Sequence, residues 1–406
     1  MLQPDYLLHI SEGAENIAEQ LHIDIINRIV ERIMIRIGRG DNNLITAVDK
    51  WQIEVLQDAG YLLEDIQKEI AKRTKQQEAE IREAMIDAGV RTIEYDNAIY
   101  EAAGLSPLPL MQSPHLMRLM ERNYEATLHE WQNYTRTTAN AAQQLFIQTV
   151  NKAYHMTASG AISYTQAVRE AVNDIVKDGV KVKYPSGHRD TIETATLRAV
   201  RTGIAQATGE ITNARMEEMD WDIILVSSHL GARIGDGGEN PGNHAWWQGK
   251  FYSRTGRTPG LPLFEQSTGY GTGEGLEGWN CRHSHGPGDG EHNPFEHYDS
   301  EENKKAYELQ QKQREIERTI RKIKREVMGM KTAVDNAQDE KLKFELDLKY
   351  QDAAAYLQKW NKKYNEFCKE NNLKRLSDRL EVARFDRQQA AAARGAAARY
   401  NNRKEK

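Results

Sequence analysis

The chain has 406 residues and a net charge of −5, with 39% hydrophobic and 28% charged residues. At roughly 100–200 residues per domain, this length predicts two to four domains. No apolar run approaches the roughly 20 residues that span a bilayer, Met1 to Ile10 lacks the basic region of a signal peptide, and Cys281 and Cys368 are too few for a disulfide framework. The composition thus argues against a membrane protein, a collagen or a small secreted scaffold, and favours a reducing compartment.

Charge is unevenly distributed along the chain. Residues 301–406 contain 27 Lys/Arg and 18 Asp/Glu, whereas the remainder contains 28 and 42. A basic tail on an acidic body indicates an anionic polymer such as DNA as a partner for the tail, or simply a solvated, lysine-rich helix. The cations predicted to contact phosphates are at the very end of the chain: Arg394, Arg399, Arg403 and Lys404.

The first 155 residues are predicted to be helical. Ser11 is a suitable N-cap, and isoleucine or leucine then recurs every four residues from Ile17 to Ile37, which is the apolar stripe of one helix face. The segment 38–41 (GRGD) is predicted to end this helix. Further helices are predicted at 44–60, 62–88 and 114–154, with a break at Pro107 and Pro109. This region carries no clustered chemistry and is predicted to be an all-α interaction region.

Residues 156–300 change in character. Two helices are predicted at 163–178 and 191–219, with a short strand near Val182 between them and an apolar strand at 222–227. The segment 231–290 contains 16 of the chain's 29 glycines, and four of the seven tryptophans are nearby. Glycine density with aromatic residues predicts an ordered, loop-rich structure. The fold class is therefore predicted to be α+β and predominantly α, with a glycine-rich module between helical regions.

Residues 301–406 are predicted to form a helical tail. Apolar residues alternate spacings of four and three, which indicates a coiled-coil seam that pairs with itself or with a partner helix. The alternative is an α-hairpin folded onto the body of the protein. The seam residues are Ile316, Ile320, Ile323, Val327, Met330, Val334, Ala337, Phe344 and Leu348.

The glycine-rich segment contains the residue types of a zinc site. Cysteine and histidine are the ligands of structural zinc, which takes four of them in tetrahedral array. The spacing Cys281-x-His283-x-His285 lacks the usual two-residue turn. The competing interpretation is that these side chains lie in the core of the loops, with hydrogen-bond partners and without a metal. The candidates are His229, His244, Cys281, His283 and His285, of which His244, Cys281 and His283 are the predicted ligands.

The same residues allow two catalytic hypotheses. Cys281 with a histidine can act as nucleophile and base if the thiol pKa is depressed. A histidine, His229 or His283, can do acid–base work with Asp236 or Glu239. The sequence supplies these residue types without their geometry, so no catalytic residue is assigned.

The segment Gly273-x-Gly275-x-x-Gly278 fits the dinucleotide-binding fingerprint in its letters alone. No strand precedes it, and Trp279-Asn280-Cys281 follows in place of a helix. These glycines are instead predicted to let the backbone turn tightly before the segment 280–283.

Four short runs carry a resemblance to a known family. The segments 226–233 (VSSHLGAR), 244–249 (HAWWQG), 268–273 (TGYGTG) and 278–284 (GWNCRHS) resemble the phage minor capsid protein 2 family, which is similar to the phage Mu F-like head-morphogenesis proteins. The resemblance covers about 160–290. Residues 1–150 resemble the family only in their helical character. The matching residues are His229, Arg233, His244, Trp247, Gly249, Gly271, Asn280, Cys281, Arg282 and His283.

The resemblance implies a low-copy structural protein of a phage or prophage head. Its expected partners are the portal protein and capsid components, on which the helical region 1–155 is expected to dock, and packaged DNA, which the basic tail is expected to contact. Its expected location is the virion head near the portal, after assembly in the host cytoplasm. Roles in head assembly and in DNA packaging or delivery follow. The alternative is a virion-delivered enzyme, a nuclease or toxin-like transferase, housed in 221–300. No cofactor is expected apart from the zinc hypothesis.

Overall fold

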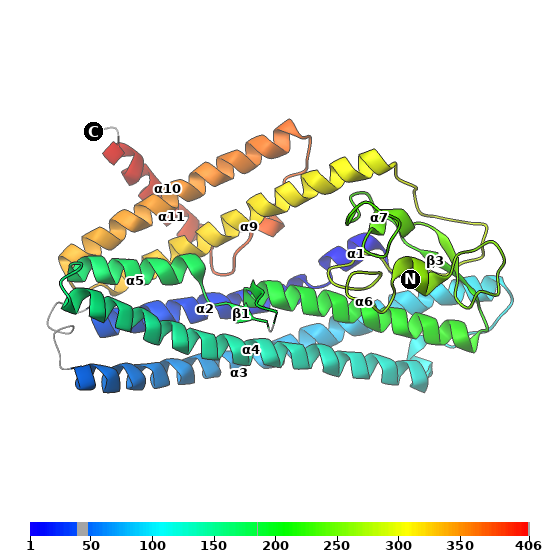
Figure 1. Ribbon diagram of the computed structural model, residues 1–406, viewed down its shortest axis with the longest axis horizontal. Helices are drawn as coiled ribbons and strands as arrows, with labels where there is room; N and C mark the ends of the chain where they lie inside the picture. Colours follow the sequence, from blue (N-terminus) through cyan, green and yellow to red (C-terminus); the bar gives the residue numbers. More distant parts are fainter. Residues whose placement is uncertain (39–47, 185, 405–406) are drawn as a thin grey trace. The chain divides into compact units, whose positions relative to one another are not determined.

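The computed structural model describes residues 1–38, 48–184 and 186–404. Helices account for most of these residues, and the strands form two small antiparallel sheets (Figure 1). The predicted α+β class with a predominance of helix is therefore confirmed. None of the helices in the described part of the chain has an apolar stretch long enough to cross a membrane.

Helix α2 (Glu12–Ile37) begins directly after Ser11, as predicted, and follows the short helix α1 (Pro4–His9). The backbone N–H of Glu15 donates to the Ser11 carbonyl oxygen at 2.9 Å, which closes the first helical turn. The predicted stripe is the buried face of α2. Its fully buried members are Leu21, Ile25, Ile29, Ile33 and Ile37.

Helix α3 (Val48–Ala102) is continuous, so the predicted division into helices at 44–60 and 62–88 is wrong. Gly60 lies inside the helix, and no atom lies within 4 Å of the position that a Cβ would occupy. An interior glycine weakens a helix by only about 1 kcal/mol, which the 55 residues of α3 tolerate. The predicted start at Leu44 lies outside the described residues.

The middle of the chain follows the predicted order of elements. Pro107 and Pro109 separate α3 from the 3-10 helix η2, as predicted. The Oγ of Ser163 accepts a hydrogen bond from the backbone N–H of Gln166 and caps the helix that begins at Tyr164. The elements are η2 (Leu110–Gln112), α4 (Pro114–Ala158), α5 (Tyr164–Asp178), the strand pair β1 (Val182–Lys183) and β2 (Arg189–Asp190), and α6 (Ile192–Glu218).

A three-stranded antiparallel sheet underlies the glycine-rich segment. Strand β3 (Ile223–Val226) is central, between β4 (Phe251–Ser253) and β5 (His285–Pro287). Only β3 was predicted, because β4 and β5 have three residues each and are embedded in loops without a strand period. Two short helices complete the segment: α7 (His244–Trp247) and α8 (Phe264–Thr268).

The tail consists of α9 (Ser300–Asn336), α10 (Glu340–Glu370), the 3-10 helix η3 (Asp378–Leu380) and α11 (Arg387–Lys404). The seam residues from Ile316 to Val334 are buried, but the chain turns before Asp339, whose carboxylate caps α10. The predicted continuation of the seam is therefore wrong, and Phe344 is 64% exposed. The hydroxyl of Tyr364 on α10 donates to Glu317 on α9 at 2.7 Å, so these helices form the α-hairpin of the alternative interpretation.

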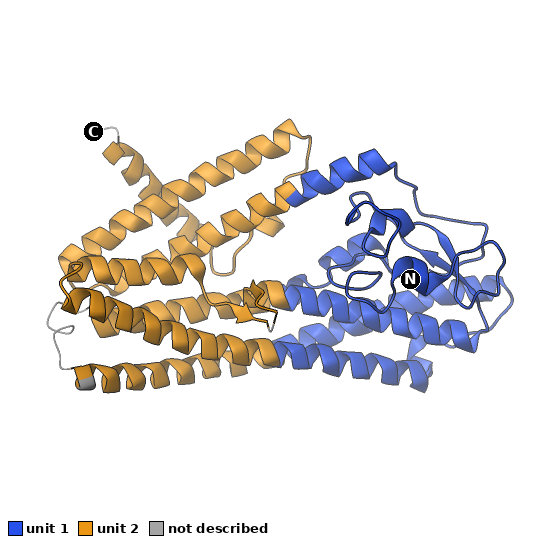
Figure 2. Ribbon diagram, in the orientation of Figure 1, with its two compact units in different colours: residues 1–15, 76–132, 196–311 blue, residues 16–75, 133–195, 312–406 orange. Residues whose placement is uncertain are grey.

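The chain divides into two compact units (Figure 2). Unit 1 contains residues 1–15, 76–132 and 196–311, and unit 2 contains residues 16–75, 133–195 and 312–406. Each of the three regions predicted from the sequence contributes residues to both units, and the three-region division stays a prediction.

Unit 1 has two hydrophobic clusters. The first joins α3, α4 and α6. The second lies under the glycine-rich segment, where Tyr100 from the end of α3 meets Trp221 edge-on, with ring centroids 5.4 Å apart. The second cluster anchors the loops to the helices of the same unit. Its buried members include Ile224, Trp247, Tyr252, Phe264, Leu276 and Cys281.

Candidate functional site

Residues 221–290, here called the loop module, surround β3 and are organised by a few side chains that bond to backbone. Asp222, directly before β3, accepts hydrogen bonds from the hydroxyls of Ser253 (2.6 Å), Thr255 (2.6 Å) and Thr258 (2.7 Å). It also accepts from the backbone N–H groups of Thr255 and Thr258. Burial alone would raise the pKa of Asp222, but these donors outweigh it and hold the pKa well below its usual range. One carboxylate thereby fixes the loop after β4.

Trp247 is the centre of the module's core and is fully buried. Its indole N–H donates to the Pro241 carbonyl oxygen at 2.9 Å, and its own carbonyl oxygen accepts from the Tyr252 hydroxyl at 2.7 Å. The indole N–H of Trp247 and the hydroxyl of Tyr252 therefore both have hydrogen-bond partners, as buried polar groups require. The ring also lies against His244 and His283, at centroid distances of 4.5 and 4.8 Å.

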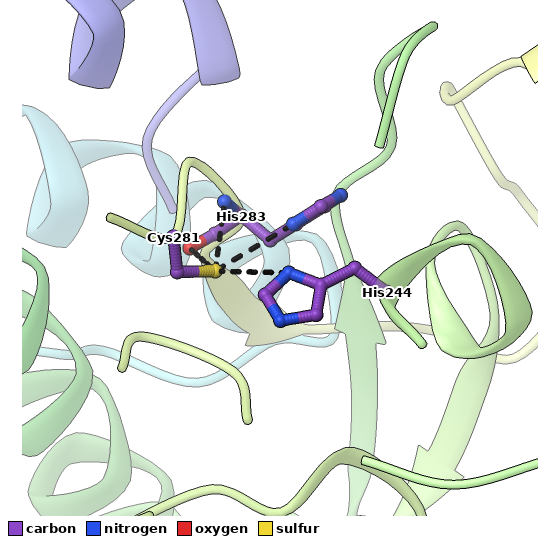
Figure 3. A group of neighbouring side chains, drawn as sticks. All are labelled: His244, Cys281 and His283. Carbon is purple, nitrogen blue, oxygen red and sulfur yellow. Dashed lines mark hydrogen bonds between the residues drawn. The ribbon is translucent and has the colours of Figure 1, made fainter. Parts of the chain in front are cut away.

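His244, Cys281 and His283 form a buried group whose side chains point toward one another (Figure 3). The Cys281 Sγ lies 3.7 Å from His244 Nδ1 and 3.6 Å from His283 Nδ1. The candidate ligand atoms all lie within 4.8 Å of one another. The structure thus brings the three predicted ligands together, from the first residue of α7 and from the segment that leads into β5, and this group could hold a metal.

The electrostatics of this group favour neutral side chains as long as no cation is bound. Burial lowers the pKa of His244 to about 4 and lowers that of His283 well below its usual value. Burial also raises the pKa of the Cys281 thiol to about 11. A thiol in this state is a poor nucleophile at neutral pH, so this raised pKa does not favour the Cys–His catalytic hypothesis, although both histidines lie near the sulfur.

The other two histidines of the predicted zinc set have different partners. His285 bonds the buried carboxylate of Glu277 through Nδ1 at 2.8 Å and Asn213 through Nε2 at 3.2 Å. His229 stacks on His283 with ring centroids 4.5 Å apart, and its Nδ1 lies 3.1 Å from a guanidinium nitrogen of Arg282. His229 therefore packs against the group without belonging to it, and His285 bonds to residues outside the group.

The remaining residues of the family resemblance shape the backbone. Arg233 donates to the Trp279 carbonyl oxygen at 2.7 Å. Gly249 and Gly271 have φ values of +65° and +86°, a region that strains other residues, and Asn280 adopts it at +56°. The resemblance therefore marks loop geometry as much as side-chain chemistry.

The glycines of the dinucleotide-like motif turn the backbone, as predicted. A Cβ on Gly275 would overlap the carbonyl of Gly269, and one on Gly278 would overlap the carbonyl of Gly273. These close approaches of backbone to backbone allow the chain to double back ahead of Cys281.

Gln248 is a site residue that the sequence analysis missed. Its Oε1 accepts from His283 Nε2 at 2.9 Å and from the backbone N–H of His229 at 3.0 Å. The sequence contains no signal for this role, because a glutamine after a short helix is unremarkable in composition and period.

The predicted DNA-contact residues lie on α11 in unit 2, and two of them are ion-paired with α10. Arg399 lies 3.1 Å from Asp347, and Arg403 lies 3.1 Å from Asp352. Arg394 instead lines a cleft of about 980 Å³. Six cations and two carboxylates line this cleft, here called the basic cleft: Lys324, Lys362, Arg375, Arg384, Arg387 and Arg394, with Glu381 and Asp386.

Comparison with known proteins identifies relatives of the chain. It matches the family described as phage minor capsid protein 2 over residues 2–369. The sequence analysis placed the resemblance at 160–290, and the match corrects this by including the N-terminal helices and the tail through most of α10.

A structural protein of Lactococcus phage LL-H is 27% identical over 202 residues, which cover 47% of this chain and 51% of that protein. The chain thus spans about half the length of the curated relative that it matches. No solved structure matches the chain.

Proposed function

The chain belongs to the phage minor capsid protein 2 family, a family of structural head proteins, and we propose that it serves at low copy in a phage or prophage head, beside the portal. The observation that carries this proposal is the family match over 2–369, which includes both compact units. The packed aromatic residues in the interior of the loop module are consistent with a structural role.

The test of this proposal is the composition of purified heads. Mass spectrometry of heads from induced lysogens should detect the chain at a copy number far below that of the major capsid protein. Deletion of the gene should reduce the yield of filled heads. Heads that lack the chain, or a deletion that leaves filled heads unchanged, would contradict the proposal.

Docking on the portal is assigned to exposed apolar residues of α3. Ile53 and Leu56 are 58% and 62% exposed and lie three residues apart, on one helix face. An exposed apolar stripe on a helix suits burial against a partner, and the family resemblance makes the portal protein the expected partner.

The double variant Ile53→Ser/Leu56→Ser should leave the melting temperature unchanged and abolish cross-links between this chain and the portal in procapsids. Phe344→Ser is the matched control, since Phe344 is 64% exposed on α10. Cross-links that persist in the double variant would overturn the docking assignment.

Contact with packaged DNA is assigned to the basic cleft, to which α11 contributes Arg387 and Arg394. The cleft carries an excess of cations, and Arg387 and Arg394 are exposed at its edge. Each phosphate neutralised by such a cation contributes about 0.9 to the slope of log affinity against log salt concentration.

Arg387→Ala/Arg394→Ala should therefore weaken DNA binding and reduce that slope by up to about 2. Arg399→Ala/Arg403→Ala is the control, because both of these arginines are paired with aspartates. A larger effect of Arg399→Ala/Arg403→Ala would contradict the assignment to the cleft and would indicate that DNA contacts the last turns of α11.

A further inference from the structure

We propose that His244, Cys281 and His283 bind one zinc ion, through Nδ1, Sγ and Nδ1. Two features of the group favour a metal ion: the hydrogen atoms available to the three side chains and the distances between their ligand atoms.

The partner of His244 determines which of its ring nitrogens carries hydrogen. Nε2 lies 2.8 Å from the carbonyl oxygen of Glu274, which can only accept. Nε2 must therefore be the donor, and the lone pair of the neutral ring is on Nδ1. That nitrogen lies 3.7 Å from the Cys281 Sγ.

Gln248 determines in the same way which ring nitrogen of His283 carries hydrogen. Gln248 Oε1 accepts from the backbone N–H of His229, so its amide group has a fixed orientation. The oxygen therefore faces His283 Nε2 at 2.9 Å, and Nε2 is the donor. The Nδ1 lone pair of His283 also faces the Cys281 Sγ, at 3.6 Å.

One thiol hydrogen cannot satisfy the acceptors around it. The Cys281 Sγ faces two imidazole lone pairs and, at 3.8 Å, the His283 carbonyl oxygen. The backbone N–H of His283 also donates to this sulfur at 3.4 Å, which favours a thiolate. A cation held by a thiolate and two neutral imidazoles engages both lone pairs and the sulfur at once.

The two distances between sulfur and nitrogen fit zinc. Zn–S and Zn–N bonds of about 2.3 and 2.0–2.1 Å at tetrahedral angles place sulfur and nitrogen roughly 3.6 Å apart. The two observed separations are 3.6 and 3.7 Å. Thiolate and imidazole are ligands that zinc prefers, whereas calcium and magnesium take oxygen ligands.

The site has three protein ligands, which leaves one position of a tetrahedral ion for a non-protein ligand such as water. The histidines show the arrangement common in zinc proteins, in which the nitrogen that does not bind metal donates to an oxygen that orients the ring. Trp247 and Tyr252 enclose the group in the module's core. The ion would tie α7 to the segment before β5, two parts of the chain about forty residues apart.

The test uses the full-length protein, stripped of metal with a chelator and then titrated with Zn²⁺ or Co²⁺. Elemental analysis should find one zinc per chain, and Co²⁺ should produce the absorption band of a thiolate-to-cobalt charge transfer. Cys281→Ser should abolish the band and weaken zinc binding at least 100-fold. Cys368→Ser is the matched control, since Cys368 is the second buried free cysteine, and it should retain both.

Gln248→Leu provides a second variant that keeps all three ligands. Loss of a group that orients a ligand lowers metal affinity about 10- to 100-fold, so this variant should bind zinc more weakly with the cobalt band intact. If Cys281→Ser fails to fold, the cobalt band in the Cys368→Ser protein still decides the question. Absence of zinc and of the band in that protein, or retention of zinc by a folded Cys281→Ser, would overturn the proposal.

Discussion

The helical core of unit 2 contains a buried network of ions shared between helices, whereas the loop module of unit 1 depends on individual side chains, such as Asp222, that bond to nearby loop residues. Glu193 is 3% exposed, accepts from His22 at 2.8 Å and forms an ion pair with Arg325 at 3.1 Å. Arg325 also donates to Glu19 at 3.1 Å. Burial alone would raise the pKa of Glu193, but His22 and Arg325 hold it well below its usual value. These ions join α2, α6 and α9.

The difference shows two ways to specify a structure. The helices of unit 2 are defined by apolar periodicity, and the ion network fixes which helices meet. The loops around Asp222 have no period, so each turn depends on a particular carboxylate or glycine. Substitutions in the two regions should therefore fail in different ways, and the following predictions test this from the largest effect to the smallest.

Glu193→Ala should destabilise the protein most, by about 3–5 kcal/mol, because it leaves a buried arginine and histidine without their shared carboxylate. Urea unfolding followed by circular dichroism measures this. Glu366→Ala is the control, because Glu366 is 57% exposed and pairs loosely with Lys362, so its loss should change stability by less than about 0.5 kcal/mol. Equal effects of the two variants would mean that the network does not hold the helices of unit 2.

Asp222→Asn should destabilise the loop module by about 1.5–3 kcal/mol at pH 7, since hydrogen bonds to a charged acceptor are lost. The folded pKa is depressed, so the contribution is fully present above the unfolded value of about 3.9 and declines as the pH falls below it. The gap in melting temperature between wild type and variant should narrow progressively as the pH falls below about 4. A gap that is constant from pH 7 to pH 3 would rule out the carboxylate charge as its cause.

Gly275→Ala should destabilise the module by about 1–3 kcal/mol, because the new methyl group overlaps backbone atoms that cannot rotate away. Hydrogen exchange measured by mass spectrometry should show faster exchange in peptides covering 264–283. Gly395→Ala on α11 is the control, because no atom lies within 4 Å of its added Cβ. Unchanged exchange in Gly275→Ala would show that these loops can relax.

Gly60→Ala should have the smallest effect and the opposite sign, stabilising α3 by about 0.5–1 kcal/mol. The same chemical change is thus expected to weaken the loop module and strengthen the helical core. Urea unfolding of the two single variants gives this comparison directly. Destabilisation by Gly60→Ala would contradict the expectation that an added methyl group has open space at this position.

Apolar periodicity predicted much of the helical structure, and its errors have physical causes. It placed a boundary at Gly60 because glycine is a weak helix former, although a long helix tolerates one. It extended the seam to Phe344 because the period continued by chance past the turn before Asp339. Strands β4 and β5 were missed because three residues are too few for a period.

The candidate site was predictable in its residue types and not in its orientation. Cysteine and histidine types, together with the family resemblance, singled out His244, Cys281 and His283. Their ring orientations depend on the Glu274 carbonyl oxygen and on Gln248, which become neighbours of the histidines only in the folded loops.

The composition of the two units has a consequence for biosynthesis. Each unit is built from three separate stretches of chain, and the last stretch of unit 1 ends at residue 311. The helices made first cannot acquire their final neighbours until residues far downstream have left the ribosome. Contacts between these stretches therefore form late, and we expect nascent and truncated chains to be prone to aggregation.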